Sequence, residues 1–246
     1  GQLLAGGYKI PENSVNSTAL SAAYIANAHG ADASYFNPAA MVFDKDGASF
    51  EVNATYIHLT SISYTDIGGA ASPDHSEREH FLVPSFHYVS PYMGNTRFGL
   101  SVVTPAGLTK RWRGTGKAAS EEFTLKTIEF NPSVAYKFND IFSAAFGARM
   151  IYSNGDVRSN ATPVTLWRDL GGSSYDFGYN LALHFKPSKE WDVALTYRSK
   201  IDLTVKGDAE LASPFGTYSG GAEVLVPVPA AINLAAAYTF NDRTTV

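Results

Sequence analysis

The sequence predicts an all-β chain that forms the wall of a transmembrane antiparallel β-barrel. From about Ala48 onward the residues alternate between apolar and polar with a period of two, the alternating runs are long, and short connections alternate with long ones. Successive side chains of a strand point to opposite faces, so such a run gives one apolar and one polar face. Soluble strands average about 5–6 residues, which favours the membrane barrel over a soluble β-sandwich, the remaining alternative.

Composition agrees with this class and excludes others. Charged residues make up 17% of the 246 residues and aromatic residues 13%, whereas soluble domains average about 25% charged residues. A net charge of −4 gives no reason to expect a nucleic-acid partner. The absence of cysteine excludes a disulfide framework, and apolar runs are too short for a transmembrane helix. The chain opens on Gly1 without a basic segment, as a mature or trimmed product would.

Residues 191–206 show the alternation most clearly. Trp191, Val193, Leu195 and Tyr197 share one parity, which continues to Val205, while charged and small residues such as Asp192 share the other. On this pattern we expect the apolar parity to face lipid, with Leu195, Leu183 and Phe146 among the lipid-facing residues and Thr196 facing inward.

Eight strands are expected, separated by connections of two kinds. The predicted strands are roughly 48–64, 81–90, 96–104, 123–138, 140–155, 173–187, 190–206 and 222–240. The short connections are 90–95, 139–140, 187–189 and 241–243, and the long ones are 66–80, 105–121, 156–172 and 207–220. Short turns at one rim and long loops at the other are typical of outer-membrane barrels.

The segment before Ala48 lacks sustained alternation and is rich in Ala, Asn, Ser and Gly, with a short helix expected around residues 17–28. An eight-stranded barrel has room inside only for its own side chains, so a plugged lumen needs a wider barrel. We therefore expect residues 1–46 to form an N-terminal hatch or plug and residues 47–246 to form an incomplete wall. The last residues, 243–246, look like the start of another strand.

Several ordered stretches resemble the FadL/TodX-type transporters of hydrophobic compounds. They are residues 5–14 (AGGYKIPENS), residues 31–39 (ADASYFNPA), residues 195–199 (LTYRS) with 205–207 (VKG), and residues 226–229. The resemblance implies a bacterial outer-membrane barrel of about fourteen strands, plugged by an N-terminal hatch. It also implies passive uptake of long-chain fatty acids or related hydrophobic small molecules, which leave sideways through the wall into the membrane. With about eight strands, this chain would be a fragment or a truncated form.

Five residues are candidates for the hatch and the lateral gate. Asn37, Pro38 and Ala39 match the family's hatch segment, and Pro38 stiffens it because proline fixes φ and restricts the preceding residue. Pro105 and Gly107 follow the third strand, where a proline and a glycine weaken the ladder and could open the wall. The alternatives are an ordinary turn at Asn37–Ala39 and a plain loop start at Pro105. We expect Asn37–Ala39 to lie near the third strand and Pro105.

Three arginines are candidates for the ligand's carboxylate, since a buried carboxylate needs a partner and arginine pairs with it bidentately. The resemblance places Arg158 within about one residue of a basic family position, and Arg149 and Arg198 lie on the inward parity. The alternative for all three is pairing with inward acids, namely Glu129, Asp192 or Asp202.

Two clusters of charged residues could bind ions, and two other functions are compatible with a membrane barrel. Lys110, Arg111, Arg113 and Lys117 could meet lipopolysaccharide phosphates at the outer rim, or simply be solvated. His75, Glu77, Glu79 and His80 could bind metal, but a polar exposed loop explains them better. A lipid-hydrolysing enzyme would need a histidine on the lipid-facing parity near a rim, unlike His184, and a structural or adhesive barrel would not need a hatch. We expect no catalysis, cofactor or metal, and a monomer.

Overall fold

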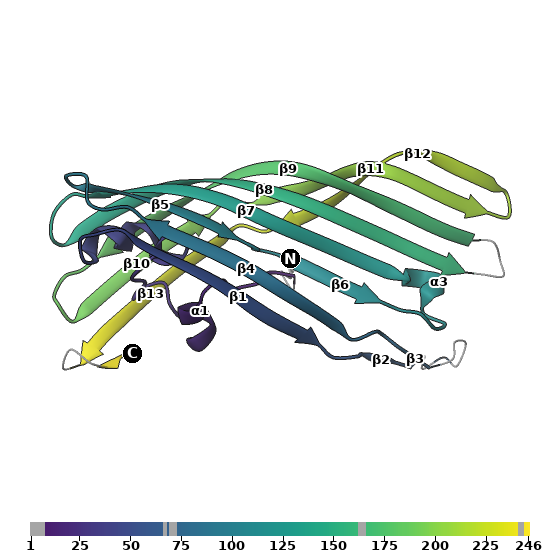
Figure 1. Ribbon diagram of the computed structural model, residues 1–246, viewed down its shortest axis with the longest axis horizontal. Helices are drawn as coiled ribbons and strands as arrows, with labels where there is room; N and C mark the ends of the chain where they lie inside the picture. The colour runs from purple at the N-terminus through teal and green to yellow at the C-terminus, as the bar shows by residue number, and fades with distance from the viewer. Residues whose placement is uncertain (1–7, 66–67, 69–72, 162–165, 241–243) are drawn as a thin grey trace.

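The computed structural model describes residues 8–65, 68, 73–161, 166–240 and 244–246, and shows one large antiparallel sheet (Figure 1). The helical elements are α1 (Val15–Ala19), α2 (Ala33–Phe36), the 3-10 helix η1 (Pro38–Phe43) and α3 (Lys117–Ser120). The strands are β1 (Ser49–Leu59), β2 (Ser63–Tyr64), β3 (Asp74–His75), β4 (Glu79–Val89), β5 (Thr96–Val103), β6 (Gly107–Arg111), β7 (Glu122–Lys137), β8 (Phe142–Ala161), β9 (Leu166–Phe185), β10 (Trp191–Arg198), β11 (Ile201–Ser213), β12 (Gly216–Val228), β13 (Ala231–Phe240) and β14 (Thr244–Thr245). The main path runs β1-β4-β5-β7-β8-β9-β10-β13-β14 and is not closed, as expected of a partial barrel wall.

The outer face of the sheet is apolar. Leu195 is 40% exposed, Leu183 41% and Phe146 50%, whereas Thr196 is buried. Aromatic pairs gather at the end with the short turns, and these are Tyr136–Phe138, Phe138–Phe142, Trp191–Tyr238 and Tyr238–Phe240. Rings at the level of the head groups are the girdle of a membrane barrel. The prediction that the three apolar residues face outward is confirmed.

Three predicted strands are interrupted. The expected strand 48–64 ends as β1 at Leu59, and β2 pairs with β3 in a small separate sheet. The other two interruptions lie deeper in the wall. The expected strand 190–206 is interrupted at residues 199–200, and the strand 222–240 is interrupted at residues 229–230. Arg198 pairs with Ala231 and Ile201 with Val228, so the two breaks lie side by side in the sheet. We call this feature the double break.

After the double break, the apolar residues of β11 lie on the inner face of the sheet and not on the outer face. Ala194 and Thr196 are buried on β10, and Ile201, Leu203 and Val205 are buried on β11. The prediction that one apolar face continues outward to Val205 was therefore wrong from Ser199 onward. The physical reason is register, because a one-residue irregularity sends every following side chain to the opposite face.

Two predicted long loops are instead strand. The β8–β9 hairpin stays paired to Ala161 and Leu166, and the β11–β12 hairpin to Ser213 and Gly216. The predicted loop 105–121 also contains β6. These stretches are rich in glycine and polar residues, so alternation does not reveal them. The short turns at 90–95, 139–140 and 187–189 are confirmed, while 66–67, 69–72, 162–165 and 241–243 lie outside the described residues.

The N-terminal segment packs on the inner face of the sheet. The predicted helix over 17–28 was too long, because α1 is followed by Ser21 and Ala22 at positive φ. Helix α2 contacts β4, β5 and β7, and η1 contacts β5, β7, β8 and β9. A Cβ at Gly99 would lie 2.7 Å from the sulfur of Met41. Glycine on β5 therefore lets η1 approach the wall closely.

Candidate ligand-binding site and wall opening

The wall is open between β4 and the β5–β6 pair. The register of β4 with β5 covers only Phe86–Val89 against Gly99–Val102, although β4 begins at Glu79. Both β5 and β6 pair with β7, and residues 104–106 separate them. A cavity of about 490 Å³ fills the gap. It is lined by residues of both faces, since Leu82 and Leu108 are exposed outside whereas Leu125 is buried inside. We call it the wall opening.

Residues 8–10 of the N-terminal segment are paired with the strand break beside this opening. Ile10 N donates to Pro105 O at 3.0 Å, and Gly107 N donates to Tyr8 O at 2.8 Å. Lys9 and Ala106 form an antiparallel bridge between these bonds. The predicted gate residues Pro105 and Gly107 thus supply backbone groups to a segment that sequence reasoning had not placed there.

Asn37, Pro38 and Ala39 are buried, and Asn37 and Ala39 form hydrogen bonds with another part of the wall. The Asn37 amide bonds Ile25 O and lies 3.1 Å from His184 Nδ1, and Ser143 Oγ on β8 donates to Ala39 O at 2.6 Å. These contacts are with β8 and β9, which differs from the expected place beside Pro105.

His184 is buried and both of its ring nitrogens are engaged. Nδ1 faces Asn37, and Nε2 lies 2.8 Å from Asp192 Oδ1. Lys186 also donates to Asp192. This histidine therefore anchors the N-terminal segment to the inner face of the wall, on the inward parity that the sequence predicted for it.

Arg149 and Arg198 come together on the inner face around one acid. Arg149 Nε and Nη2 donate to the two oxygens of Glu129 at 3.1 and 2.8 Å, and Arg198 donates to the same carboxylate. Glu129 is fully buried and Arg149 nearly so. Of the acids considered for these arginines, Glu129 is the partner of both. Two guanidinium groups share one carboxylate, so the cluster keeps a positive charge.

Lys9 adds a third cation. It lines a cavity of about 250 Å³ together with Arg149, Arg198 and Tyr35, and its ammonium donates to Pro229 O at 3.2 Å. Burial, and then the charges of Arg149 and Arg198, lower the pKa of Lys9. Three basic groups around one acid favour a second carboxylate, which would relieve their repulsion. We call this cavity the head-group pocket.

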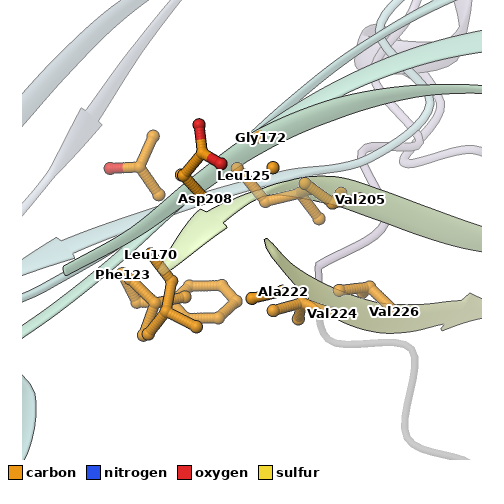
Figure 2. A pocket seen from close by; sticks show the side chains of 14 residues that line it. Phe123, Leu125, Leu170, Gly172, Val205, Asp208, Ala222, Val224 and Val226 are labelled. Carbon is orange, nitrogen blue, oxygen red and sulfur yellow. The ribbon is translucent and has the colours of Figure 1, made fainter. Parts of the chain in front are cut away.

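An apolar lining adjoins the head-group pocket. Its buried members are Leu125, Ile151, Ile201, Leu203 and Val228, with Tyr8, Phe123 and Val226 packed against them. Val228 lines the head-group pocket as well. Figure 2 shows the neighbouring groove, where Phe123 and Leu170 lie together on one side and Ala222, Val224 and Val226 follow one another on the other. The reversed face of β11 supplies much of this surface.

Arg158 lies near the end of β8 and is not among the residues that line the head-group pocket. It pairs with Asp169, directly opposite on β9, at 3.2 Å, and both side chains are almost half exposed. The structure therefore brings Arg149 and Arg198 together and leaves Arg158 in an exposed pair.

The predicted rim cations have partners of their own. Lys110 donates to Thr60 O at 3.1 Å, Arg111 to Glu79, and Arg113 to Glu121 at 3.0 Å. A phosphate would compete with these partners, and contact with lipopolysaccharide, including at Lys117, stays a prediction.

The histidines and glutamates of the first long loop also have partners among neighbouring side chains. His75 contacts Ser63, Glu77 and Glu79 pair with Arg111, and His80 contacts Tyr56.

An antiparallel wall with an apolar outer face and a segment packed against its inner face defines part of a transmembrane β-barrel. Within the described ranges, none of the helices is long and apolar enough to cross a membrane. The chain belongs to the family described as "Outer membrane protein transport protein (OMPP1/FadL/TodX)", which matches residues 1–246. This confirms the resemblance and places the protein in the bacterial outer membrane, in a family of transporters rather than enzymes.

Curated relatives are long-chain fatty acid transport proteins. Those of Shigella flexneri and Escherichia coli (strain K12) are 25% and 24% identical over 233 residues, which cover 79% of this chain and 50% of each relative. The chain thus spans about half the length of the curated relatives that it matches.

Solved structures show the same fold. A Pseudomonas aeruginosa FadL homologue matches with a TM-score of 0.84 at 20% identity, covering 98% of this chain and 68% of that one. The P. putida toluene transporter TodX matches with a TM-score of 0.69 at 17% identity, covering 88% and 64%.

Proposed function

We propose that this protein takes up long-chain fatty acids or related hydrophobic small molecules through a plugged barrel with a lateral exit. The observation that carries the proposal is the head-group pocket, which adjoins an apolar lining. A fatty acid needs both surfaces, because its carboxylate must be paired and its chain must leave water. The curated relatives are named as transporters of the same class of ligand.

In the proposed path, ligand enters from the end of the barrel with the long hairpins and passes the exposed Arg158. Its carboxylate then binds between Lys9, Arg149 and Arg198, and its chain lies along Ile151 and Leu203. Glu129 keeps the arginines in place meanwhile, so the pocket is formed before ligand arrives.

Residues 1–46 act as the plug in this proposal, and residues 47–246 act as wall. The link between ligand and exit is the segment of residues 8–10. Lys9 belongs to the head-group pocket, while the backbone of Tyr8 and Ile10 pairs with the strand break at the wall opening. A ligand that draws Lys9 from Pro229 would loosen this pairing and free the way to lipid.

Replacing Arg198 with Met is expected to weaken oleate binding roughly ten- to a hundredfold, because a charge-assisted hydrogen bond contributes about 1.5–3 kcal/mol. Glu129 stays paired with Arg149, so the wall keeps its local structure. Binding of hexadecane, which has no head group, should change less than twofold. Titration of the purified protein with both ligands measures the two effects.

Arg158→Met is the matched control. Its pair with Asp169 is exposed, and exposed pairs contribute about 0–1 kcal/mol, so oleate affinity should fall by a few-fold at most. A larger loss at Arg158 than at Arg198 would move the head group to the outer rim. Equal losses of oleate and hexadecane would make Arg198 a structural residue.

A further inference from the structure

Two histidines face each other on the outer surface of the wall. His58 on β1 is directly opposite His80 on β4 in the antiparallel register. Their rings lie 4.6 Å apart between centroids at an interplanar angle of 14°, and both residues are exposed. The acids nearest to His80 in sequence, Glu77 and Glu79, form ion pairs with Arg111. The two histidines therefore have no ion pair with these acids.

Tyr56 orients one of the two rings. It lies two residues before His58 on the same face of β1, and its hydroxyl is hydrogen-bonded to Nδ1 of His80. With Nδ1 so engaged, Nε2 is the nitrogen of His80 left for another partner. A metal-binding histidine typically makes a hydrogen bond through its second nitrogen, which fixes the ring and its tautomer.

From this arrangement we propose that His58 and His80 bind a divalent metal ion of the zinc, copper or nickel type. Imidazole nitrogen suits these metals, whereas Mg²⁺ prefers oxygen. Two nitrogens bound at about 2.0–2.1 Å from one metal lie about 3–4 Å apart, so the stacked rings need only tilt toward each other. Among the described residues, groups of three or more histidine, cysteine or acidic ligands are absent, so water fills the other positions.

The proposed site has a structural consequence. His80 also lines the wall opening, so a bound metal joins β1 to β4 at the edge of that opening. Since the metal binds the folded register and holds both strands, it raises the thermal stability of the protein. The site stands on the geometry of β1 and β4 and does not depend on the proposed uptake.

Calorimetric titration of the metal-free protein in detergent with ZnCl₂, NiCl₂ or CuCl₂ tests the proposal. We expect one equivalent of at least one of these metals to bind, with MgCl₂ giving no heat of binding. His58→Ala and His80→Ala should each weaken binding at least tenfold, and Tyr56→Phe about tenfold. His75→Ala is the matched control, since His75 is exposed nearby and contacts Ser63, and it should leave binding unchanged.

Electron paramagnetic resonance of the unaltered protein with one equivalent of Cu²⁺ avoids any effect of substitution on folding. The expected spectrum shows hyperfine coupling to two imidazole nitrogens. A spectrum without nitrogen coupling, or equal metal affinity in the His58→Ala/His80→Ala variant, would overturn the proposal and identify the two rings as an aromatic cross-strand pair only.

Discussion

A disulfide between residues 9 and 106, introduced by Lys9→Cys and Ala106→Cys, is expected to abolish oleate uptake while the barrel stays folded. The bonds from Ile10 to Pro105 and from Gly107 to Tyr8 flank this pair, so Lys9 and Ala106 form a non-hydrogen-bonded pair with Cα atoms about 4.5 Å apart. That spacing suits a disulfide, and the sequence has no other cysteine. The bond would hold the N-terminal segment against the strand break, and the proposed exit would stay shut.

Uptake of labelled oleate by cells that produce the variant, oxidised and then reduced, measures the effect. Reduction should restore uptake to the level of the same double variant kept reduced throughout. That sample is the control for the loss of the Lys9 charge, because it lacks the charge but has no disulfide. The Ala106→Cys single variant should be insensitive to oxidation. Full uptake by protein shown to be cross-linked would exclude movement at this contact.

Replacing Glu129 with Ala should produce the largest loss of stability among single changes in the wall. The substitution leaves Arg149 and Arg198 beside each other without their shared carboxylate. Removing one partner of a buried ion pair costs about 3–5 kcal/mol, because a buried charge is left without compensation. Urea unfolding of the protein in lipid vesicles measures the free energy of unfolding.

Asp169→Ala is the control for this change. It removes the acid of the exposed Arg158–Asp169 pair on neighbouring strands, and the expected cost is about 0–1 kcal/mol. If the two substitutions cost the same, water enters the head-group pocket freely, and the arginines are as well solvated there as at the rim.

The class of fold could be predicted from the sequence because a strand with one face in lipid shows apolar and polar residues in alternation. Leu183 and Leu195 share a parity with apolar neighbours, and both lie on the outer face. The double break could not be predicted in this way. The alternating pattern continues through residues 199–200 without a visible interruption. That Ile201 faces inward is seen only from the pairing of β11 with β12 and from the inner apolar cluster.

The candidate site was predictable only in part, for a related reason. Arg149 and Arg198 lie within alternating runs, so the pattern predicts that both side chains face inward. Lys9 lies outside any alternating run, and its place depends on a bridge to Ala106 that spans most of the first hundred residues. Pro105 could have predicted this contact in part. A proline ends the hydrogen-bond ladder of its strand, so the backbone groups of the neighbouring residues can pair with another segment.

Photo-cross-linking with a fatty acid that carries a diazirine at the end of its chain tests the lateral exit most directly. Illumination during uptake, followed by mass spectrometry of the peptides, locates each adduct. The proposed path predicts adducts on Leu82 and Leu108, the exposed residues of the wall opening. Adducts confined to Phe43 and Tyr92, at the end with the short turns, would show instead that ligand leaves along the barrel axis.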